Sequence, residues 1–81
     1  MADMSDLCAA EAMVRAARKR ATLARSHIRR LVEMHEENED LGVTWNDRVE
    51  TEIIERVQRL GVYRNDVDEA RRKEREVLDS L

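Results

Sequence analysis

The sequence contains no proline and only two glycines, Gly42 and Gly61. Proline breaks helices and glycine weakens them, so their scarcity in a chain rich in Ala, Glu, Arg and Leu indicates long helices. Phenylalanine is absent and aromatic residues make up 2% of the chain, so a compact core would have to be built from aliphatic side chains. The 81 residues are predicted to form one small domain, residues 1–81, of the all-α class.

Cysteine and long apolar runs are also scarce. The single cysteine, Cys8, excludes a disulfide framework within the chain and is typical of a reducing compartment, so we expect a cytoplasmic location. No apolar run approaches the ~20 residues that a membrane-spanning helix needs. The acidic N-terminal sequence lacks the basic start of a secretion signal. We therefore expect no membrane contact.

Catalytic and metal-binding residues do not occur at the spacings that their chemistry requires. His27 and His35 are eight residues apart, not the three or four that place two ligands on adjacent helix turns. Cys8 and the hydroxyl-bearing residues have no His and acid arrangement that chain spacing suggests, and no glycine-rich phosphate loop occurs. The sequence thus predicts a non-enzymatic protein with no catalytic residue, no cofactor and no metal.

The first half of the chain carries a regular heptad pattern. Apolar residues recur at intervals of three and four from residue 7 to residue 31, which predicts one unbroken helix over residues 5–40, with its cap at Ser5 and Asp6. The resulting seam comprises Leu7, Ala10, Val14, Ala17, Ala21, Ala24, Ile28 and Leu31. Its small central residues permit close approach of another helix, so we expect the seam to make oligomer or partner contacts.

A similar phrase occurs twice, as LGVTWND at residues 41–47 and LGVYRND at residues 60–66. Glycine followed by an apolar residue is typical of helix C-terminal caps, and the Asn and Asp that follow favour helix starts. The phrase therefore predicts helix ends at both glycines. Two shorter helices, residues 45–60 and 65–80, would form a helical hairpin after the long N-terminal helix.

The lengths of these helices predict self-association. At ~1.5 Å per residue the long helix spans roughly 54 Å and each short helix roughly 24 Å, so the hairpin would cover only about half of the seam. An uncovered apolar seam of that size indicates a partner. The expected assembly is a helix-bundle or coiled-coil homo-oligomer, with a dimer favoured.

Charge is distributed in blocks, although the net charge is only −3. Seven bases and no acid lie between residues 15 and 30, and five acids without Lys or Arg lie between residues 33 and 40. The predicted basic face comprises Arg15, Arg18, Lys19, Arg25, Arg29 and Arg30. Such a face suits a protein partner with an acidic surface, the phosphates of a nucleic acid, or the chain's own acids at Glu50, Glu52 and Glu55, and solvent or these internal acids are the favoured surroundings.

Residues 53–72 also resemble a DNA-binding motif. Leu60-Gly61-Val62, Arg64, Val67 and Ala70 are similar to the turn and recognition helix of bacterial transcription regulators of the GntR type. The resemblance implies that Tyr63, Arg64 and Asn65 contact nucleic acid in the major groove.

Two functions therefore remain open. The favoured one is a non-enzymatic protein–protein interaction module, of adaptor, assembly or inhibitor type, that acts through the Ala-rich seam and the basic face. The alternative is a small helix-turn-helix-like regulator that binds nucleic acid, with the basic helix on the phosphates and residues 63–72 as a recognition helix.

Overall fold

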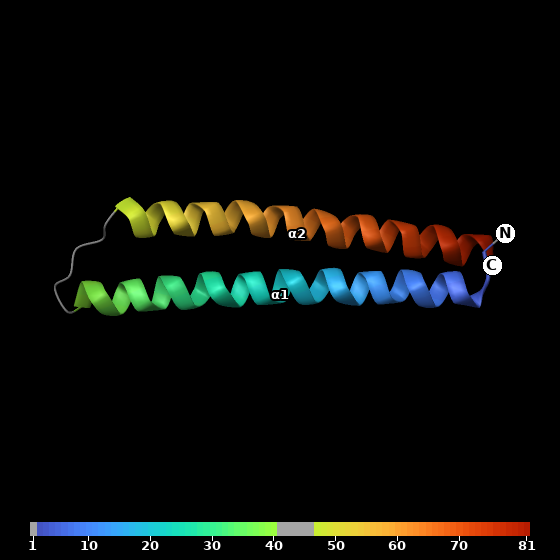
Figure 1. Cartoon of the computed structure of the whole chain (residues 1–81), viewed down its shortest axis with the longest axis horizontal. Coiled ribbons are helices and arrows are strands. Elements are labelled where there is room, and N and C mark those ends of the chain that lie inside the picture. The colour runs from blue at the N-terminus through green and yellow to red at the C-terminus, as the bar shows by residue number, and fades with distance from the viewer. Residues whose placement is uncertain (1, 41–46) are drawn as a thin grey trace.

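The chain folds as a hairpin of two long helices (Figure 1). A computed structural model describes residues 2–40 and 47–81. Helix α1 spans Met4–Asp40 and helix α2 spans Asp47–Ser80. The helices lie side by side in opposite directions, so that the two termini meet at one end of the hairpin (Figure 1). All regular structure in these residues is helical, which confirms the predicted all-α class.

The hairpin is a rod and not a globule. Its Cα radius of gyration is 18.3 Å and its principal extents are 62 × 16 × 12 Å. A compact domain of this length would have a radius of gyration of about 12 Å. Because the rod is only two helices wide, each side chain lies either in the single interface between the helices or on the outer surface.

Helix α1 begins with a reciprocal cap. The backbone N–H of Asp6 donates to Oδ1 of Asp3 at 2.9 Å, and the N–H of Asp3 donates to Oδ2 of Asp6 at 3.1 Å. This is a capping box built from two carboxylates, which also favour the positive end of the helix dipole. The predicted unbroken helix over residues 5–40 is confirmed, with its N-cap at Asp3 and not at Ser5.

Helix α2 differs from the prediction because it continues through Gly61, where the sequence predicted a break between helices 45–60 and 65–80. Gly61 lies on the exposed side, and a Cβ there would meet no atom within 4 Å. One face of α2 is buried or partly buried, and its residues alternate at intervals of four and three. They are Val49, Ile53, Arg56, Leu60, Tyr63, Val67, Ala70, Glu74 and Val77. This face runs unbroken past Gly61, and packing along it outweighs the helix cost of one glycine, about 1 kcal/mol. The other predicted cap, at Gly42, lies outside the described residues.

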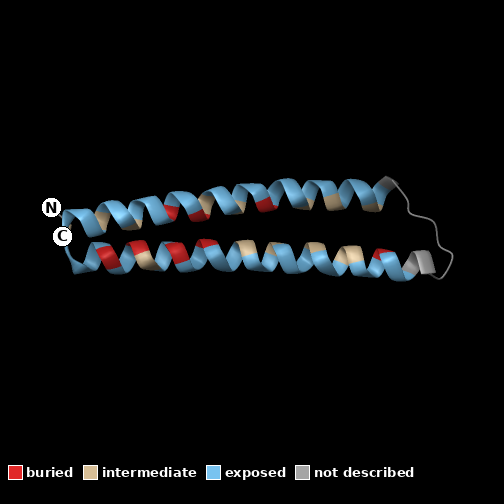
Figure 2. Cartoon of the chain, turned by 180° about the vertical axis from the view of Figure 1, so that it is seen from behind, coloured by how far each residue is buried: buried red, intermediate tan, exposed pale blue. Residues whose placement is uncertain are grey.

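The core is the seam between α1 and α2, where the buried residues face one another (Figure 2). Of the predicted seam, Leu7, Ala10, Val14 and Ala17 are buried, and Ala21, Ala24, Ile28 and Leu31 are half-buried. Helix α2 of the same chain covers these residues, because one helix of 34 residues is roughly 51 Å long. Among the described residues, α2 therefore covers the half of the seam that was expected to lie open. The length of α1 no longer implies an oligomer.

Small side chains on one helix meet larger ones on the other. Val14 and Ala17 form a cluster with Val67 and Ala70, and Ala21 packs against it. From this cluster, the heptad positions run toward higher numbers along α1 and toward lower numbers along α2. Following them places Ala24 across from Leu60. Alternation of small and large residues across a seam lets two helices approach closely without leaving voids. At the loop end of the seam His35 is buried.

Candidate functional site

The residues beside the seam form two long flanks, one on each side of the hairpin. In an antiparallel pair of helices, equivalent heptad positions of the two helices face each other on each side. On one side lie Arg18, Arg25, Arg64 and Arg71, which we call the arginine flank. On the other side lie Met13, Arg20, His27, Arg59, Asp66 and Lys73, which we call the second flank.

The arginine flank brings four guanidinium groups from both helices to one hollow of about 440 Å³. Asp68 is the one acid that lines this hollow. Within the described part of the chain, none of the four guanidinium groups lies within 4.0 Å of a carboxylate. Four arginines beside a single acid leave an excess of positive charge along this hollow, so a bound anion would lower the energy there.

Both ends of the arginine flank are apolar. On α2, Val57, Arg64, Arg71 and Leu78 recur every seven residues and so lie on the same side of the helix. Val57 and Leu78, the outer two, are half-exposed. Beyond Arg71 a neighbouring hollow also contains Glu74 and other mixed charges. The flank therefore has a basic centre between two exposed apolar side chains.

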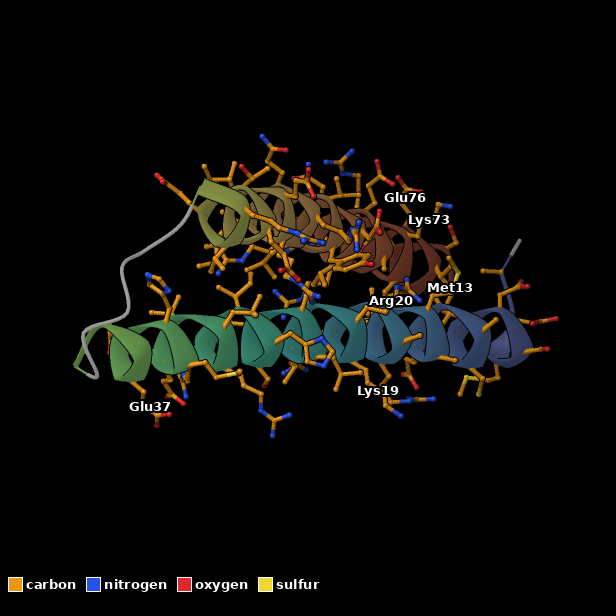
Figure 3. The ribbon with its side chains drawn as sticks, turned by 60° about the vertical axis from the view of Figure 1, so that its left-hand side comes forward. Met13, Lys19, Arg20, Glu37, Lys73 and Glu76 are labelled. Carbon is orange, nitrogen blue, oxygen red and sulfur yellow. The ribbon has the colours of Figure 1, made fainter. Side chains whose placement is uncertain are left out.

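The predicted basic face is divided by the structure. Arg18 and Arg25 belong to the arginine flank, and Arg15 lines the neighbouring hollow with Arg18, Arg71 and Arg75. Lys19 extends away from α2, on the opposite side of α1 from Arg20 (Figure 3). Arg29 and Arg30 are exposed and line neither hollow.

The predicted nucleic-acid contacts do not share one face of α2. Tyr63 is half-buried in the seam, Arg64 belongs to the arginine flank, and Asn65 is exposed beyond it. Residues 60–64 are helical, so the turn of a helix-turn-helix is not formed at Gly61. Arg71 and Arg75 were not predicted from the sequence, since their placement beside Arg15 and Arg18 depends on how α2 packs against α1.

A metal-binding cluster and a membrane-spanning helix were both sought in residues 2–40 and 47–81. No cluster of three His, Cys, Asp or Glu side chains there could hold a metal ion. Cys8 is exposed, and His27 and His35 lie apart, the first on the second flank and the second in the seam. Neither helix, over its described length, is apolar enough to cross a membrane.

The two flanks are the places where the hairpin gathers charged side chains from both helices. Compared with known proteins, the chain matches no family model, no curated protein and no solved structure.

Proposed function

We propose that the chain is a non-enzymatic interaction module that binds an acidic surface of a partner protein along its arginine flank. The observation that supports this proposal most strongly is that four arginines of both helices line one hollow and have no carboxylate within 4.0 Å in the described residues. Guanidinium groups form paired, charge-assisted hydrogen bonds with carboxylates, and arginine is enriched in protein interfaces. An acidic partner would add these bonds and remove the repulsion between the two helices.

A protein partner fits the arginine flank better than a nucleic acid does. The half-exposed Val57 and Leu78 at its two ends suit apolar side chains of a protein surface, whereas a phosphate backbone offers them no contact. Binding to nucleic acid is therefore the competing outcome of the experiment below.

Reversing two charges of the arginine flank is expected to abolish most of this binding. In the double variant Arg18→Glu/Arg71→Glu, each helix loses one cation and gains an anion, so affinity for a labelled oligoglutamate peptide should fall by at least ~100-fold. Fluorescence anisotropy at low and near-physiological salt measures the effect. The peptide is a stand-in for acidic protein surfaces and carries no apolar side chains.

The matched control is Lys19→Glu/Arg72→Glu, which changes the net charge equally at two exposed neighbouring positions. It should bind within about threefold of the unchanged chain, because exposed charges away from the contact contribute little. Equal losses in both double variants would mean that only net charge matters and would refute the site. If the chain binds a mixed-sequence DNA duplex more tightly than oligoglutamate at near-physiological salt, the partner of the arginine flank is a nucleic acid and not an acidic protein.

A further inference from the structure

The second flank contains a small hollow in which cationic and hydrogen-bonding side chains of both helices meet. Its volume is about 200 Å³. It is lined by Arg20, Leu23, Ala24 and His27 of α1 and by Arg56, Arg59 and Tyr63 of α2. We call it the Arg20 hollow. It lies on the opposite side of the seam from the arginine flank, so it is a separate site.

One of the three arginines in the Arg20 hollow is already neutralised. Nη2 and Nε of Arg56 donate to Oε1 of Glu52 at 3.1 and 3.4 Å. Arg20 and Arg59 have no carboxylate within 4.0 Å among the described residues. The Arg56–Glu52 pair occupies one wall, while Arg20 and Arg59, from opposite helices, make no ion pair with a described residue at the same hollow. Arg20 also lines the adjoining hollow, which contains Asp66 and Glu69.

We propose that the Arg20 hollow binds a phosphate dianion, either free or carried as a monoester. The two guanidinium groups supply forked donors and two positive charges, which match the charge and oxygen geometry of a phosphate. The Tyr63 hydroxyl and the His27 ring are further groups that can donate hydrogen bonds. Leu23 and the Tyr63 ring form an apolar wall that suits the organic side of an ester.

The size of the hollow agrees with this class of ligand. The hollow, of about 200 Å³, is open to solvent on one side and has room for several water molecules. That space admits a phosphate group and a small organic substituent. In Figure 3 Arg20 extends toward α2 and Lys19 extends away from it, so adjacent residues provide a variant and its control.

The test is an NMR titration of the full chain, following the arginine Nε–Hε signals and the Tyr63 ring signals. The ligands are phenyl phosphate and inorganic phosphate, each compared with sodium chloride at equal ionic strength. We expect the Arg20, Arg59 and Tyr63 signals to shift together and to saturate with either phosphate. Arg20→Gln and Arg59→Gln should each weaken binding about tenfold, as expected for one charge-assisted contact, whereas Lys19→Gln should leave it unchanged.

The two phosphate ligands distinguish the source of the anion. Tighter binding of phenyl phosphate supports a monoester that uses Leu23 and Tyr63, and equal binding supports free phosphate. Shifts that sodium chloride reproduces, or an equal loss in Lys19→Gln, would overturn the proposal. Neither result depends on the arginine flank, so this site and the proposed function can fail separately.

Discussion

Ala17→Glu is expected to unfold most of the hairpin, whereas Ala12→Glu should leave it folded. Ala17 is 2% exposed and belongs to the cluster formed with Val14, Val67 and Ala70. A carboxylate placed there would be buried among apolar side chains without a partner. The expected loss is about 3–5 kcal/mol of unfolding free energy, a large part of the stability of a small domain.

Thermal unfolding followed by circular dichroism at 222 nm measures this difference. Ala12 lies on the exposed outer side of α1, five residues before Ala17, so the same new carboxylate remains in water there. Its substitution should change the unfolding free energy by less than about 1 kcal/mol. Similar melting temperatures for the two variants would contradict a core formed between α1 and α2 of one chain.

Gly61→Pro is expected to break α2, and Gly61→Ala is expected to strengthen it. Proline removes a backbone N–H and clashes with the preceding turn, at a cost of about 3 kcal/mol inside a helix. Alanine should raise the unfolding free energy by about 1 kcal/mol, since helix propensity is the only property that changes. The added Cβ would meet no atom within 4 Å.

The sign of the Gly61→Ala change separates one continuous helix from two helices. A glycine in a left-handed cap, as the sequence predicted, would be strained by alanine, and the variant would then lose stability. Urea unfolding at equilibrium gives the required free energies. Asn65→Ala, at another exposed position of α2, is the control and should gain a few tenths of a kcal/mol through helix propensity alone.

Helix α1 could be predicted from the sequence because its local and periodic signals agree. Its seam positions from Leu7 to Leu31 are all apolar, and no residue in the helix opposes helical backbone. In α2 the seam includes Arg56 and Glu74, so the apolar period is interrupted and the local Leu-Gly-Val phrase dominates the prediction. Packing against α1, which the sequence does not display, determines the outcome at Gly61.

The candidate sites could be predicted only in part, since each is formed by two helices. Arg18 and Arg25 were identified from the run of bases in α1. Their neighbours Arg64 and Arg71 depend on the continuity of α2 and on the antiparallel register. The Arg20 hollow likewise joins one arginine of α1 to two of α2. Neither hollow exists within a single helix.

Mapping the bound face by NMR tests the proposed function most directly. With oligoglutamate added to the full chain, we expect the Nε–Hε signals of the arginine flank to shift together and to saturate. The Arg72 signal should stay in place, because that side chain is exposed. It lines neither the hollow of the arginine flank nor the neighbouring hollow that contains Glu74. Shifts of equal size in Arg72 and in the arginine flank, or no shift at all, would contradict the account.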